Sequence, residues 1–159
     1  MAAYIKFDGI DGEAQDKDHK SWTDLAAFSQ LITKPGQGTG STRRRGDVIL
    51  EDLHCTKELD KSSPKIAEAV CKGKVFPKVE IHLTASYTDS GRITYYAYEL
   101  KNVQVVSYDI SGSGQADDVP MENFSLNFEE IKVTYTENDN TGKKKGNVEY
   151  TWKVEEGEA

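Results

Sequence analysis

A single short stretch of this 159-residue chain, residues 59–73, has the pattern of a helix, and the rest is patterned as strands. Ser63 is the expected helix cap, because a serine oxygen can accept from the free amide donors of a first helical turn. Pro64 follows at the first helical position, where a missing N–H costs nothing, and Gly73 provides the left-handed residue that ends a helix. One amphipathic helix at residues 63–72 is therefore predicted, with an apolar face made of Ile66, Ala67, Val70 and Cys71.

The remaining segments alternate apolar and polar residues at the two-residue spacing of strands. Strands are expected at residues 3–8, 22–33, 48–59, 75–87, 92–110, 120–136 and 147–154. The second of these would also tolerate a helix, and a change of phase near Glu129 and Glu130 indicates a β-bulge in the sixth. Regular strands with one helix predict a mainly β fold, a small closed or nearly closed β-barrel.

The chain is expected to form a single domain over residues 1–159, with a long glycine-rich loop at 34–46 and an acidic tail at 155–159. Charged residues make up 30% of it and hydrophobic residues 36%, so much of each strand has to face water or a polar partner. This composition favours a thin β-structure with two wetted surfaces over a compact enzyme with a deep cleft.

The charge and the apolar runs exclude two classes of partner. A net charge of −7 argues against nucleic acid, because a phosphate backbone would repel most of such a surface. No run approaches the ~18 apolar residues that a spanning helix needs, so no membrane insertion is expected. The N-terminal residues lack a basic region followed by an apolar core, so no cleavable secretory signal is expected either.

No catalytic, cofactor or metal site is predicted, so the chain is not expected to be an enzyme. His19, His54 and His82 are too few and too widely separated for a recognisable zinc pattern. The glycine run at 36–40 is followed by a strand and not by the helix N-terminus that a phosphate cradle requires. Cys55 and Cys71 are expected to be a reduced, buried pair. A disulfide between them would require the helix to pack over the strand that holds Cys55.

Three short sequence segments, called words below, occur in a characteristic order. They are Asp-Lys-Asp-His-Lys at 16–20, Asp-Lys-Ser-Ser-Pro at 60–64 and Glu-Asn-Phe-Ser-Leu-Asn-Phe at 122–128. Each is weak alone, but their order and spacing across nearly the whole chain resemble the haemolysin-coregulated protein (Hcp) family, the tube protein of bacterial type VI secretion. The tail-tube-like barrel of that family agrees with the fold expected from the strand pattern.

The resemblance implies a homohexameric ring around an open channel, with rings of the same protein stacked into a tube. A contractile sheath would drive this tube, tipped by a VgrG-type spike, out of the cell, and secreted effectors would travel in its lumen. The protein would then reside in the bacterial cytoplasm before firing and be exported by the type VI system without a cleavable signal peptide.

Within such a ring, two sets of residues have expected roles. Ser29 is the candidate for contact with cargo on the channel wall, where alternation gives it a face shared with Thr23, Ala27 and Leu31. Many relatives have a Trp-Ser-Trp-like sequence here, whereas this chain has Phe-Ser-Gln at 28–30. The long loop contains Arg43, Arg44 and Arg45, and Asp47 follows just after it. Because guanidinium groups pair well with carboxylates, this loop is expected to dock on an acidic surface of the next ring and so stack one ring on the other.

Two other interpretations of the strand pattern remain open. The first is a tail-tube-like protein of a phage or a contractile bacteriocin, which would share the barrel but not the secretion role. The second is a monomeric ligand-binding β-barrel, suggested by a set of strand aromatics: Tyr95, Tyr96, Tyr98 and Trp152. The native mass of the protein separates this second reading from a ring.

Overall fold

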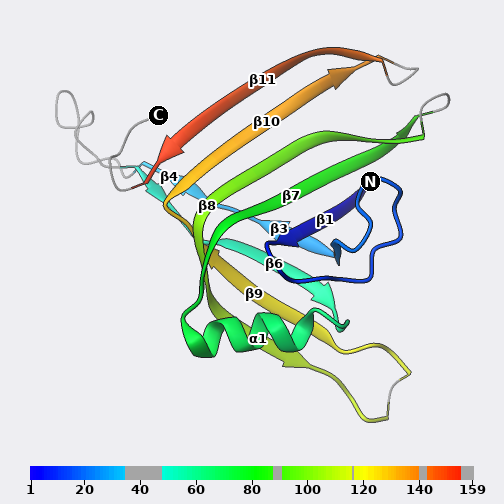
Figure 1. Ribbon diagram of the computed structural model, residues 1–159, viewed down its shortest axis with the longest axis vertical. Coiled ribbons are helices and arrows are strands. Elements are labelled where there is room, and N and C mark those ends of the chain that lie inside the picture. The colour runs from blue at the N-terminus through cyan, green and yellow to red at the C-terminus, as the bar shows by residue number, and fades with distance from the viewer. Residues whose placement is uncertain (35–47, 88–90, 116, 140–142, 155–159) are drawn as a thin grey trace.

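The computed structural model describes residues 1–34, 48–87, 91–115, 117–139 and 143–154, which form eleven strands and one helix (Figure 1). The strands are β1 (Ala2–Phe7), β2 (Thr23–Leu25), β3 (Ala27–Ser29), β4 (Ile32–Thr33), β5 (Ile49–Leu50), β6 (Leu53–Glu58), β7 (Val75–Tyr87), β8 (Gly91–Ser111), β9 (Met121–Asn127), β10 (Glu130–Asn138) and β11 (Lys144–Lys153). The helix is α1 (Ser63–Lys72). The predicted mainly β fold with one short helix is confirmed.

The strands form one large antiparallel sheet in the order β2-β1-β7-β8-β9-β6-β3, with β10 paired to β8 and β11 paired to β10. The two end strands, β2 and β3, are consecutive parts of one segment, separated by Ala26, whose N–H donates to the carbonyl oxygen of Thr56 at 2.8 Å. The described residues show no strand ladder that closes the sheet into a ring. A small separate sheet pairs β4 with β5.

Strand β8 organises the fold, because its two halves have different neighbours along one edge. Its first half pairs with β10 and its second half with β9, so the chain turns away between Asn127 and Glu130 (Figure 1). Asn102, near this change of partner, has a φ of 52°, a left-handed conformation that asparagine tolerates better than most residues. The strand and bulge expected over residues 120–136 are therefore wrong: this segment is two strands.

The segment expected as one strand at 22–33 is also divided, into β2, β3 and β4. Each part pairs with a different strand: β2 with β1, β3 with β6, and β4 with β5. Thr23 and Leu25 are buried, whereas Ala27, Ser29 and Leu31 are exposed, so the orientation of the side chains changes at the break. Thr23 consequently does not share a face with Ser29, contrary to the prediction.

The core lies on one face of the curled sheet and is closed by the helix. Inward residues of β1, β7 and β8, such as Ile5, Ile81 and Leu100, are fully buried, and Ile66 of α1 packs against the same cluster. Fully burying a side chain of this size contributes about 1.5–3 kcal/mol. The opposite face of the sheet is left to polar residues, and this face includes the predicted cargo contact.

The cap predicted for the helix is wrong by one residue. Ser62 is the N-cap, but its side chain accepts no hydrogen bond from the helix amides, whereas Ser63 is the first helical residue and is buried. The Ser63 hydroxyl is engaged elsewhere, in the buried network described below, so it is not available to the helix amides. Pro64 lies in the first turn and Gly73 ends the helix with a φ of 63°, both as expected.

The predicted pair of buried cysteines is half wrong. Both thiols are free, but Cys55 is buried in the core while Cys71 is exposed on the solvent side of α1. The helix turns Ile66 and Ala69 inward, which leaves Cys71 outside the apolar stripe. Burial raises the pKa of the Cys55 thiol well above its usual range, so this thiol stays protonated and unreactive.

Candidate functional site

Ser29 lies beside a row of hydrogen-bonding side chains that crosses three strands, β6, β9 and β8. It is exposed on β3 and pairs in register with His54 of β6. The Nδ1 atom of His54 lies 2.8 Å from the Ser125 hydroxyl on β9, which in turn accepts from the Ser107 hydroxyl of β8 at 2.8 Å. The predicted cargo residue therefore lies next to an ordered row of polar side chains.

Two further sets of cross-strand bonds flank this row on the same face. The Thr56 hydroxyl donates to the Asn123 amide oxygen at 2.7 Å, and the Asn123 amide donates to Asp109 at 3.3 Å. On the other side, the Asn127 amide donates to Asp52 at 3.0 Å. We call this outward surface of β3, β6, β9 and β8 the polar face. It contains a hollow of about 310 Å³, and its lining includes the hydrogen-bonding side chains of His54, Ser107, Asn123 and Ser125.

A second hollow, of about 290 Å³, lies beside β2 and the segment that joins β6 to α1. Its lining includes four carboxylates, from Glu13, Asp24, Glu58 and Asp60. Burial raises the pKa of Asp24, and the negative charges of Asp60 and Glu58 raise it further. This acidic hollow is suited to a cationic group, because an added positive charge would relieve the repulsion among its carboxylates.

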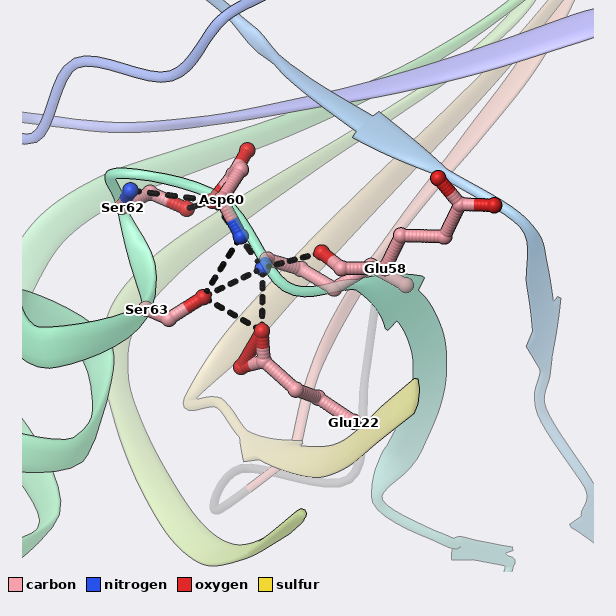
Figure 2. Close-up of polar contacts among 6 residues, drawn as sticks. Glu58, Asp60, Ser62, Ser63 and Glu122 are labelled. Atoms are coloured by element: carbon pink, nitrogen blue, oxygen red, sulfur yellow. Dashed lines mark hydrogen bonds and ion pairs between the residues drawn. The ribbon is translucent and has the colours of Figure 1, made fainter. Parts of the chain in front are cut away.

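A buried lysine, Lys57, binds residues of two of the three sequence segments, 60–64 and 122–128. The side chains of Lys57 and Glu122 are both 0% exposed, and Lys57 Nζ lies 2.8 Å from Glu122 Oε1 (Figure 2). The ammonium group also contacts Asp60 Oδ1 at 3.1 Å and the Ser63 hydroxyl at 3.0 Å. It donates as well to the carbonyl oxygen of Glu58 at 2.9 Å. The end of β6, the start of β9 and the first turn of α1 are thereby held together.

Hydrogen bonds within the same network stabilise the turn before the helix. The Ser63 hydroxyl donates to Glu122 and accepts from the backbone N–H of Asp60 at 3.0 Å (Figure 2). The backbone N–H of Ser62 donates to Asp60 Oδ1 at 2.9 Å. Residues 60–64 and 122–128 were noted for their order in the chain, but sequence reasoning missed that Lys57 and Glu122 are buried. Alternation offered a signal, since both occupy inward positions of their strands, beside Cys55 and Phe124.

The third word, at 16–20, builds a separate cluster around His19, which is buried. Its Nδ1 lies 2.6 Å from Asp16 Oδ2 and its Nε2 lies 2.9 Å from His82 Nδ1. Its ring stacks on Tyr4 with the centroids 4.7 Å apart. The cluster continues to Glu80, whose Oε2 is 3.3 Å from His82 Nε2. This chain of contacts ties the loop between β1 and β2 to the neighbouring strand β7.

This arrangement makes the fold sensitive to acid. The hydrogen bond and positive charge of His19 hold the pKa of Asp16 below its usual range, and burial lowers the pKa of His82, as does the charge of His19. For both groups the stabilising contribution is present above the unfolded pKa and is lost as the pH falls. If both imidazoles were protonated, two N–H groups would face each other across the 2.9 Å contact.

We therefore expect the melting temperature to fall as the pH is lowered below about 6.5, the ordinary pKa of histidine. The His82→Gln variant should show a flatter profile between pH 7.5 and pH 5, because the ring whose pKa is lowered by burial is gone. Differential scanning calorimetry over this range tests the effect, with His54→Gln as the control on the polar face. Parallel profiles for the wild-type protein and His82→Gln would contradict it.

The remaining sequence expectations have mixed outcomes. The residues predicted for ring stacking lie outside the described residues; they are Arg43, Arg44, Arg45 and Asp47. The aromatics that suggested a ligand-binding barrel pack on the core instead, since Tyr98 is buried and Tyr95, Tyr96 and Trp152 are partly buried against it. In the part of the chain that is described, no helix has the length and apolar character needed to cross a membrane.

Comparisons with known proteins agree with this architecture. The family model "Type VI secretion system effector, Hcp" matches residues 4–135. The chain is 32% identical over 153 residues to protein hcp1 of Pseudomonas aeruginosa, which covers 95% of this chain and 93% of that protein.

Solved structures carry the same fold. One described as a type six secretion system protein has a TM-score of 0.90 at 28% identity, covering 99% of this chain and 98% of the other. Hcp1 from Salmonella typhimurium has a TM-score of 0.78 at 20% identity, covering 99% of this chain and 97% of the other. The chain therefore belongs to the Hcp family, the non-enzymatic proteins secreted by the type VI secretion system, which form hexameric rings.

Proposed function

We propose that this protein is the tube subunit of a type VI secretion system. Six copies form a ring around an open channel, rings stack into a tube, and effectors travel in the lumen. A contractile sheath and a VgrG-type spike are the partners that such a tube requires. Family membership supports this proposal, as does a fold that keeps polar side chains on the second face of its main sheet.

The polar face is the observation that carries the proposal. Its side chains form bonds across three strands, so they are held in place and present a wall suited to water and polar cargo. A monomer gains little from such an ordered surface, whereas a channel needs one. We assign this face to the channel wall, and Ser29, exposed at its edge, remains the candidate for contact with cargo.

The ring is tested by its mass. Native mass spectrometry at micromolar concentration should show a dominant species of six times the 17.7 kDa chain. Closed rings form when one patch of a subunit meets a different patch of the next and the rotation closes, so intermediate oligomers should be scarce. A predominantly monomeric protein under these conditions would remove the tube function.

We also propose that the loop at 34–46 docks in the acidic hollow of the next ring. The loop contributes three consecutive arginines, and the hollow gathers four carboxylates. Strands β4 and β5, which flank the loop in sequence, lie at the left edge of Figure 1, whereas the segment between β6 and α1 lies at the lower right. The strands that flank the basic loop in sequence and the acidic hollow thus lie on different sides of the molecule, which suits head-to-tail stacking of rings.

A further inference from the structure

The apolar face of the core continues beyond the part that the chain itself covers. On β8 and β10 the inward residues Leu100 and Val133 are 0% and 4% exposed. Farther out on the same face, Tyr135 is 45%, Tyr150 44% and Val148 74% exposed. Register places all of these on one side, because Tyr150 pairs with Val133 and Val148 pairs with Tyr135. We call the exposed set, Tyr135, Val148 and Tyr150, the hairpin face.

The hairpin of β10 and β11 has further features of an interface. Within the described residues, β11 pairs with β10 alone, so its ten-residue outer edge has no strand beside it. The other side of the hairpin is polar: Lys132 lies 3.7 Å from Glu149, and Thr151 pairs with Lys132 in register. A long amphipathic hairpin with a free edge is a ready template for another chain.

A second exposed apolar set lies on β4 and β5. Leu31, Ile32, Val48 and Ile49 are all exposed, and Ile32 and Ile49 belong to two strands that pair with each other. We call these four residues the β4–β5 tip. Other exposed aliphatic residues stand singly along the chain, whereas these occur as two adjacent pairs on facing segments. In Figure 1 the tip lies at the left edge, near the C-terminal end of β11, while the hairpin extends away to the upper right.

We propose that the hairpin face of one copy covers the β4–β5 tip of the next copy around the ring. This inference rests on the proposed ring, and it names the two surfaces that build it. A closed ring requires two different patches on each subunit, and this chain exposes one apolar patch on each of two separate elements. Burying both removes from water the large apolar side chains that a lone subunit leaves exposed.

Two single substitutions test the two halves separately. Val148→Asp places a charge on the hairpin face, and Ile49→Asp places one on the tip. Each should give folded monomers, with the circular dichroism spectrum of the wild type and no hexamer by native mass spectrometry. Thr151→Asp is the matched control: it lies on the same strand, on the opposite face and beside Lys132, and it should remain hexameric. If Val148→Asp does not fold, Val148→Ser should still raise the concentration needed for hexamers at least tenfold.

Mixing the two monomeric variants distinguishes this contact from others. The intact tip of Val148→Asp should bind the intact hairpin of Ile49→Asp, which gives a one-to-one heterodimer that cannot grow because its two free surfaces are both altered. Hexamers from Ile49→Asp alone, or no heterodimer in the mixture, would overturn the assignment of the tip. Hexamers from every variant would overturn the whole inference but leave the ring intact, whereas a monomeric wild type would refute the ring itself.

Discussion

Replacing Lys57 by methionine should lower the free energy of unfolding by about 3–5 kcal/mol, the usual cost of removing one partner from a buried ion pair. The substitution keeps the length of the side chain but removes the ammonium group that four oxygens surround. The Glu122 carboxylate would then be buried without a counter-charge. Because whole domains are stable by only about 5–15 kcal/mol, the change is large. Urea unfolding followed by circular dichroism measures it.

Two further variants show whether the charge is responsible. Lys61→Met removes an exposed cation from the same segment and should leave the stability within about 0.5 kcal/mol of the wild type. The double variant Lys57→Met/Glu122→Leu removes both charges and should recover much of the loss, since apolar pairs of similar volume replace buried ion pairs well. A Lys57→Met protein as stable as Lys61→Met would show that the network is not needed for the fold.

Changing Arg43, Arg44 and Arg45 to glutamate should leave hexamers intact and suppress the growth of tubes. Six chains of net charge −7 make a ring of −42, so stacked rings repel one another unless local attraction offsets the repulsion. An exposed ion pair contributes only about 0.2–1 kcal/mol, but six subunits repeat it around the ring. Electron microscopy of the assembled protein measures tube length, and native mass spectrometry measures the hexamer.

The controls separate local docking from total charge. Changing Lys143, Lys144 and Lys145 to glutamate alters the net charge by the same amount at the exposed start of β11, and tubes should persist. Adding Glu13→Lys and Glu58→Lys to the arginine variant cancels the negative charge of the acidic hollow, so it no longer repels the glutamates of the loop and stacking should be restored in part. Salt should weaken stacking more than the ring, since exposed pairs are screened. Unchanged tubes in the arginine variant would remove the loop from the mechanism.

Local signals were sufficient to predict several elements to within a residue or two. The helix expected at 63–72 is α1 (Ser63–Lys72), and the strand expected at 75–87 is β7 (Val75–Tyr87). A proline in the first turn, a left-handed glycine at the end and an unbroken alternation are properties of neighbouring residues, so they can be read without knowing the fold. The cap predicted at Ser63 was wrong because the Ser63 hydroxyl donates its hydrogen bond to Glu122, a residue far away in the chain.

Two segments that were each predicted as one strand are several strands in the structure, because their parts pair with different neighbours. Segment 120–136 alternates almost continuously, yet β9 pairs with one half of β8 and β10 with the other. Alternation shows which residues share a face but not which strand lies alongside. For the same reason, Ser29 was correctly placed on a strand, but Thr23 was wrongly placed on the same face.

The sequence by itself determined the mainly β class and the position of the helix. It also determined the family, through three short segments that occur in the family's order. Only the tertiary structure decided that Glu122, within one of those segments, pairs with Lys57, which lies outside them. Lys57 and Glu122 are 65 residues apart, and each alone would be an intolerable charge at an inward position. The pairing of β6 with β9 brings them within 2.8 Å, and because an ion pair depends on the distance between its charges, no local pattern could reveal it.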